Sequence, residues 1–90
     1  MYDGLRRLRV HGRRRVLVEM LGPRPSQRAG HREEPLTARV VDAGEDVVGL
    51  PVGQLVLVGL YAGTLIRDGG RELLALHDED VLVTVHPEEA

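Results

Sequence analysis

The chain contains no cysteine, phenylalanine, tryptophan or lysine, and only two tyrosines. The absence of cysteine excludes disulfides, thiolate metal sites and cysteine nucleophiles. Because aromatic residues are so scarce, the core has to be aliphatic, built mainly from valine and leucine. No apolar run approaches the roughly 20 residues that a membrane-spanning helix needs, and no apolar segment follows the first arginines as it would in a secretory signal. The sequence therefore predicts a cytoplasmic protein that does not contact a membrane.

The length of 90 residues is enough for one domain and too short for an enzyme with a separate cofactor-binding domain. Hydrophobic residues make up 42% of the chain, which is typical of a globular domain. A chain of this size buries only about 60–68% of its unfolded surface, so added stability from oligomerisation is expected. We therefore interpret residues 1–90 as a single domain, with an N-terminal extension (1–7), an exposed loop (21–35) and a frayed tail (86–90).

The net charge of −2 conceals two halves of opposite sign. Residues 1–40 contain ten arginines and four acidic residues, whereas residues 41–90 contain two arginines and ten acidic residues. Such halves favour head-to-tail contact between copies, or ion pairs within one fold, over a general nucleic-acid surface. Charge alone does not separate these two alternatives. Tyr2 is the one aromatic residue near the N-terminal arginines and no helix-turn-helix pattern is present, so no nucleic-acid partner is predicted.

Short aliphatic runs separated by glycine, proline and aspartate predict an all-β fold, a small sandwich or barrel. The expected strands are residues 15–20, 37–43, 55–58, 64–67, 72–76 and 81–85. Gly69 and Gly70 lie between two of them and predict a hairpin, because glycine supplies the positive φ angles that tight turns require. A sharp corner is expected between Gly59 and Gly63, with Tyr61 supplying one of the few large core side chains.

Several of these segments resemble the chaperonin-10 family, the co-chaperonins that cap the chaperonin folding chamber. The resemblance extends over most of the chain, from residue 8 to residue 85. The similar segments are Arg15-Val16-Leu17-Val18, residues 38–44, Val52-Gly53-Gln54-Leu55-Val56-Leu57, Tyr61-Ala62-Gly63-Thr64, and residues 72–83.

The resemblance implies a small irregular β-barrel of the chaperonin-10 type, assembled as a heptameric ring. In such a ring the first strand of one subunit meets the last strand of its neighbour. The subunit interface expected here consists of Leu8, Val10, Val16, Val81, Val83 and Val85. The loop expected to bind a partner contributes Leu21, Pro23, Arg24, Pro25, Ala29 and Gly30.

Two departures from the family weaken the expected contact with a chaperonin. The family's mobile loop carries an aliphatic triplet that docks on the chaperonin, and the loop 21–35 has none. Burying three such side chains contributes about 1.5–3 kcal/mol each. The roof hairpin is also reduced to residues 45–51, and Gln54 replaces an aspartate. The sequence thus predicts a co-chaperonin-like ring protein, or alternatively a diverged self-assembling barrel that binds another protein without a chaperonin role.

The remaining polar residues do not form a recognisable catalytic or metal site. The four histidines are scattered without metal-ligand spacing, and Asp78, Glu79 and Asp80 are adjacent rather than alternating as in a calcium loop. Ser26 has no triad motif around it. We predict no enzyme activity, no cofactor and no bound metal. The N-terminal arginines are expected to form a solvated face or to pair with the acidic turn 78–80 of a neighbour.

Overall fold

The computed structural model describes residues 7–22, 35–59 and 61–87, and within these ranges the fold is all-β. The elements are β1 (Arg15–Met20), β2 (Leu36–Ala43), β3 (Leu55–Val58), β4 (Thr64–Asp68), β5 (Arg71–His77), the short 3-10 helix η1 (Asp78–Asp80) and β6 (Val81–Val85). The predicted fold class is confirmed, and each expected strand is found within one residue of its expected ends. No helix in the described part of the chain is long and apolar enough to cross a bilayer.

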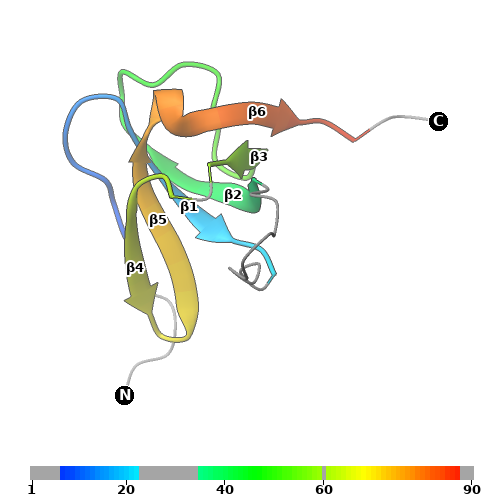
Figure 1. The fold of residues 1–90 in the computed structure, drawn as a ribbon. Coiled ribbons are helices and arrows are strands. Elements are labelled where there is room, and N and C mark those ends of the chain that lie inside the picture. The colour runs from blue at the N-terminus through cyan, green and yellow to red at the C-terminus, as the bar shows by residue number, and fades with distance from the viewer. Residues whose placement is uncertain (1–6, 23–34, 60, 88–90) are drawn as a thin grey trace.

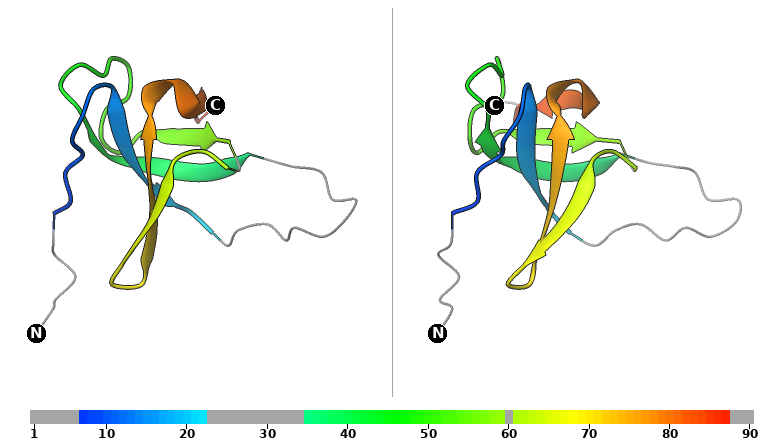
Figure 2. Two further views of the ribbon diagram at one scale, coloured as in Figure 1. Left: turned by 60° about the vertical axis from the view of Figure 1, so that its left-hand side comes forward. Right: turned by 90° about the vertical axis from the view of Figure 1, so that its left-hand side faces the viewer.

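All six strands belong to one antiparallel sheet in the order β4-β5-β1-β2-β3-β6. The sheet curls on itself, with β4 and β5 running across β2 and β3, so that it forms a small irregular barrel (Figures 1 and 2). Register shifts between Leu17 and Val18 and between Leu57 and Val58 interrupt the ladders, and such irregularities bend strands. β4 and β6 are the two end strands of the sheet.

The core inside the barrel is aliphatic, as the composition requires. Successive side chains of a strand point to opposite faces of the sheet, so β1 directs Val16 and Val18 into this core. The buried cluster consists of Val16, Val18, Leu36, Ala38, Val40, Leu50, Val56, Val58, Leu74 and Leu76. It draws on β1, β2, β3, β5 and the turn before β3, and Leu65 of β4 and Val81 of β6 pack against it, so it connects the two ends of the curled sheet.

The hairpin between β4 and β5 has the turn that its sequence predicts. Asp68 and Arg71 are partners in the ladder, and Gly69 and Gly70 between them have φ angles of 56° and 85°. Positive φ at both central positions is the geometry of a type I′ turn, whose twist matches that of the flanking strands. The prediction of this hairpin is confirmed.

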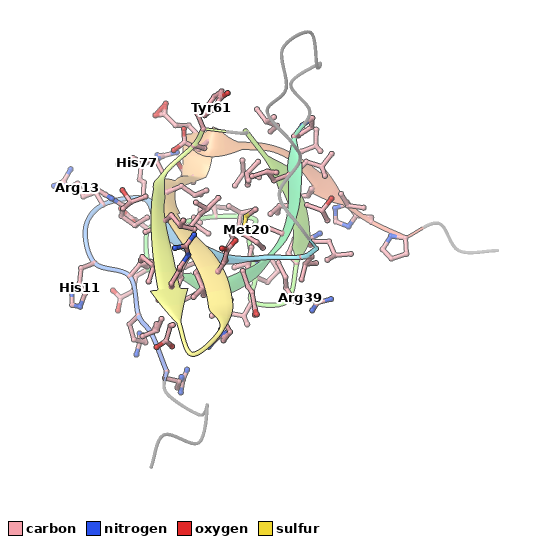
Figure 3. All side chains as sticks on the ribbon, turned by 60° about the horizontal axis from the view of Figure 1, so that its bottom comes forward. His11, Arg13, Met20, Arg39, Tyr61 and His77 are labelled. Carbon is pink, nitrogen blue, oxygen red and sulfur yellow. The ribbon has the colours of Figure 1, made fainter. Side chains whose placement is uncertain are left out.

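The corner after β3 is present, but the predicted role of Tyr61 is wrong. The Ala62 amide donates a hydrogen bond to the Gly59 carbonyl over 3.1 Å, which closes a tight turn. Tyr61 lies at the tip of this turn and is 65% exposed, on the outer rim of the barrel (Figure 3). The turn directs the ring away from the core, whose buried cluster consists of valine, leucine and alanine side chains within the described residues.

Candidate subunit interface and partner-binding segments

β6 presents an apolar, unpaired strand edge. One of its edges bonds to β3 in the register Leu55↔Val85 and Leu57↔Val83, and its place at the end of the sheet leaves the other edge without a strand partner in the described chain. Leu82 is 57% exposed and Val83 is 48% exposed. A free edge with exposed apolar side chains is a template for pairing with a second chain. β6 contains three of the expected interface residues, Val81, Val83 and Val85.

The segment before β1 places Leu8 and Val10 on one side. Both side chains are half-buried, whereas Arg7 before them and Arg9 between them are exposed. The Val10 amide donates to Asp42 Oδ2 over 2.9 Å, and Arg9 Nε lies 3.5 Å from Asp42 Oδ1. This segment is therefore tied to the end of β2. No strand pairing joins it to β6 among the described residues, so one subunit does not bring these two halves of the expected interface together.

Val16, the remaining residue of the expected interface, lies in the core of the subunit. β1 pairs with β2 along one edge and with β5 along the other. The Val16 side chain has no exposed surface. β1 therefore has no free edge for a neighbouring subunit. The segment that precedes β1 is not paired within the sheet, so it is the first stretch of the described chain that could pair with a neighbour.

Gln54 fastens the end of β6 to the sheet. Its Nε2 donates to the Leu55 carbonyl over 3.0 Å and to the Val85 carbonyl over 2.9 Å. These carbonyls belong to residues that face each other across the β3–β6 ladder. In the sequence, Gln54 is only an amide at a position where the family has aspartate. Its role in holding β6 depends on its hydrogen bond to Val85, which is 31 positions away in the sequence. A carboxylate at this position has no proton to donate to either carbonyl.

Replacing Gln54 with glutamate is expected to destabilise β6. The substitution removes two hydrogen bonds and places a negative charge beside two carbonyl oxygens, so we expect the free energy of unfolding to fall by about 1–2 kcal/mol. Urea denaturation measures this loss, and amide hydrogen exchange locates it on β6. Gln54→Met keeps the length without the charge, and its loss is expected to be the smaller of the two. Unchanged exchange on β6 in both variants would show that Gln54 does not hold the strand.

Arg14 joins three segments that are remote in sequence. Its backbone amide donates to the Asp46 carboxylate at 3.0 and 3.1 Å, and its guanidinium pairs with Asp78 through Nε–Oδ1 at 3.1 Å and Nη2–Oδ2 at 2.8 Å. The Asp78 amide donates in turn to the Arg14 carbonyl over 2.9 Å. The pKa of Arg14 is raised above its ordinary value, mainly because of the hydrogen bond to Asp78 and secondly because of the negative charge of Asp78.

Arg14 also has a φ of 54°, which is unusual for a residue other than glycine. Such a conformation persists only where the surroundings fix it, and the contacts with Asp46 and Asp78 do so. The turn before β1, the turn after β2 and η1 are therefore held at one point. The sequence predicts that Arg14 belongs to a solvated face or pairs with the acidic turn 78–80 of a neighbouring subunit. The structure instead pairs Arg14 with Asp78 of its own chain.

Ion pairs within the fold connect the two oppositely charged halves of the sequence. Three of the four ion pairs found among the described residues join residues 1–40 to residues 41–90, namely Arg9–Asp42, Arg14–Asp78 and Arg71–Glu19. Of the two alternatives left by the charge pattern, pairing within one fold is thus the one that the structure displays. Exposed ion pairs contribute only about 0–1 kcal/mol each, so they orient segments that apolar packing holds together.

The expected partner-binding loop leaves the barrel between β1 and β2. Leu21 is half-buried, and its amide donates to the Thr37 carbonyl over 3.0 Å, which extends the β1–β2 pairing by one residue. Gly22 follows with a φ of 88°. Pro23, Arg24, Pro25, Ala29 and Gly30 lie outside the described residues. The chain returns at Pro35, directly before β2.

The histidines and the acidic turn form local contacts. No group of three His, Asp or Glu residues able to hold a metal ion occurs within residues 7–22, 35–59 and 61–87. The His77 amide donates to Asp80 Oδ2 over 3.0 Å and so caps η1, and His86 Nε2 lies 2.9 Å from Thr84 Oγ1. His11 and His77 are far apart at the outer rim (Figure 3).

Comparison with known proteins finds similarity to co-chaperonins. The chain is 36% identical over 47 residues to the co-chaperonin GroES of Acinetobacter baumannii, which is 52% of this chain and 49% of that protein. It is 48% identical over 48 residues to GroES of Renibacterium salmoninarum (52% and 49%). It is also 32% identical over 56 residues to GroES of Kosmotoga olearia (60% and 63%).

No protein-family model matches the chain. The matched region spans about half the length of two of these relatives and 63% of the third. All three are co-chaperonins by name, and the curled antiparallel sheet agrees with a small barrel of that kind. The similarities therefore relate part of this chain to the chaperonin-10 family.

Proposed function

We propose that this chain is the subunit of a co-chaperonin-like ring that assists chaperonin-mediated protein folding in the cytoplasm and has no chemistry of its own. The observation that carries the proposal is the unpaired edge of β6 with its exposed Leu82 and Val83, in a barrel whose sequence is similar to GroES. A ring of seven subunits follows from the chaperonin-10 resemblance.

The proposed contact between subunits joins the edge of β6 to the segment that contains Leu8 and Val10 of a neighbour. The segment before β1 has apolar residues at alternate positions and β6 has them at four of its five positions, and within the described residues neither is paired in a ladder on the side concerned. Strand pairing of this kind satisfies backbone groups and covers apolar side chains together. Arg7 and Arg9 are exposed in the same segment, and they would lie at the margin of such a contact.

Contact with a chaperonin would use the loop that begins at Leu21, and we expect it to be weak. The loop lacks the aliphatic triplet of the family, which removes the main apolar contribution to docking. The reduced roof, residues 45–51, packs Leu50 against the core and leaves Val48 89% exposed. The proposed ring therefore has a thinner or open top.

Sedimentation velocity of the purified chain, alone and mixed with a chaperonin and ATP, tests this function. We expect a ring in the chaperonin-free sample and ATP-dependent cosedimentation that is weaker than that of a co-chaperonin with the aliphatic triplet. A strict monomer at high concentration would overturn the ring. A ring that never cosediments would favour the alternative, a self-assembling barrel with a different protein partner.

A variant in which residues 21–35 are replaced by a neutral linker identifies the contact segment. Cosedimentation should be lost in this variant while the ring persists. If cosedimentation survives the replacement, the chaperonin is held by a different part of the subunit.

A further inference from the structure

A small recess lies on the sheet face opposite the main core. Its volume is about 250 Å³, and its walls come from the segment before β1 and from β1, β4 and β5. The lining residues are Leu8, Arg9, Val10, His11, Arg15, Leu17, Ile66 and Ala75. Leu17 and Ala75 face each other in the β1–β5 ladder, and they alternate with the core residues Val16 and Leu76. The recess is thus separate from the aliphatic core and from β6.

Arg15 carries an unsatisfied donor at this recess. Its Nε is buried, and among the described residues it is the one buried side-chain nitrogen or oxygen without a hydrogen-bond partner. A buried donor without an acceptor is unfavourable, and native structures leave few of them. An acceptor from outside the chain would remove this deficit.

The turn at Gly12 passes close over the Arg15 side chain. Its φ is +103°, and a Cβ built at this position would lie 3.3 Å from Arg15 Cγ and 3.4 Å from Nε. The glycine therefore allows the turn to pass close to the guanidinium stem. This close approach helps to bury Nε.

The charge around the recess favours an anion. Arg9 and His11 line it together with Arg15, and no acidic side chain does. The neighbouring carboxylate of Asp42 already accepts from the Val10 amide and pairs with Arg9. A carboxylate ligand would form charge-assisted hydrogen bonds with Arg15, which are stronger than neutral ones.

The rest of the lining favours an aliphatic ligand of limited length. Leu8, Leu17, Ile66 and Ala75 provide apolar walls. A recess of about 250 Å³ has room for a small ligand of several heavy atoms. A six-carbon carboxylate is a ligand of this size class.

We propose that this recess binds a short-chain aliphatic carboxylate, with the carboxylate accepting from Arg15 and the chain lying along Leu17, Ile66 and Ala75. The recess shares Leu8 and Val10 with the proposed contact between subunits, but the residues assigned to the ligand, Arg15, Leu17, Ile66 and Ala75, take no part in that contact. The proposal assigns Arg15 a ligand-binding role and Gly12 a positioning role.

Titration of the full chain with hexanoate, followed by methyl NMR, tests this site. We expect saturable shifts confined to the methyl groups of Leu17, Ile66 and Ala75, with a dissociation constant in the millimolar range. Hexanol lacks the charge and acetate lacks the chain, and each should bind at least about tenfold more weakly. Equal binding of hexanol and hexanoate, or shifts spread over β6, would overturn the proposal.

Two variants separate this site from general attraction of anions. Arg15→Met removes the donor, and Ala75→Leu fills the recess; each should weaken hexanoate binding at least about tenfold. Arg13→Met removes one exposed charge outside the recess and should bind as the unmodified chain does. Loss of binding in Arg13→Met, or retention in both other variants, would contradict the site. If Arg15→Met does not fold, Ala75→Leu and the hexanol comparison decide the question.

Discussion

Replacing Gly63 with alanine is expected to lower the free energy of unfolding by about 3–5 kcal/mol. Gly63 has a φ of +73°, and a Cβ there would lie 2.6 Å from the Ala75 carbonyl oxygen and 2.9 Å from Leu76 Cβ. The left-handed conformation alone costs an L-residue about 1–2 kcal/mol. The clash adds to it, because the opposing atoms belong to the backbone and Cβ of β5, which is paired on both edges. A domain of this size has a total stability of about 5–13 kcal/mol, so the variant would lose at least about a quarter of it.

Gly70→Ala is the matched control for this prediction. Gly70 has a φ of +85°, but a Cβ there would meet no atom within 4 Å. This variant should lose only the backbone contribution, about 1–2 kcal/mol. Urea denaturation of both variants at the same protein concentration measures the difference, since association stabilises the folded state. Equal losses would show that the corner can move away from β5.

The strands were predictable because local sequence specifies them. Each is a short run of aliphatic residues, and glycine, proline or aspartate stands next to most of them, so the ends are fixed by residues that break the ladder. The hairpin at Gly69 and Gly70 was predictable for the same reason. The corner at Gly63 could be expected from its glycines, but the orientation of Tyr61 could not, because it depends on how tightly the turn closes.

The contacts that position the candidate interface were not predictable, because they join residues far apart in sequence. Arg14 and Asp78 are 64 positions apart, and Gln54 and Val85 are 31 apart. No local pattern identifies such partners. Val16 is an expected interface residue because residues 15–18 resemble the first strand of the chaperonin-10 family. The order of the sheet puts β1 in its centre, and strand order is set by packing and not by strand propensity.

Ion pairs within the subunit limit the contribution that charge can make to assembly. Because Arg9, Arg14 and Arg71 pair with acidic residues of the same chain, fewer charges remain to attract a neighbour. The proposed ring should then depend mainly on the apolar edge of β6. Added salt screens exposed charges but does not weaken apolar burial, so ring formation should change little when the salt concentration is raised.

The double variant Leu82→Lys/Val83→Lys is accordingly expected to abolish ring formation while the subunit stays folded. Both side chains are about half exposed in the single chain, so the substitutions need not disturb the core. Removing two apolar side chains from the proposed contact costs about 1.5–3 kcal/mol each, and lysine on an edge strand opposes pairing with a second strand. Association should therefore weaken by about 100-fold or more, as measured by sedimentation velocity over a concentration series.

Val52→Lys/Tyr61→Lys is the matched control, because it introduces the same charge at two exposed apolar positions outside β6. It should form the ring as the unmodified chain does, and the urea midpoints of both double variants, compared as monomers, should remain near that of the unmodified monomer. A ring that persists in Leu82→Lys/Val83→Lys would show that subunits meet through another surface. If both double variants dissociate equally, added positive charge and not the β6 edge governs assembly, which would also contradict the expected insensitivity to salt.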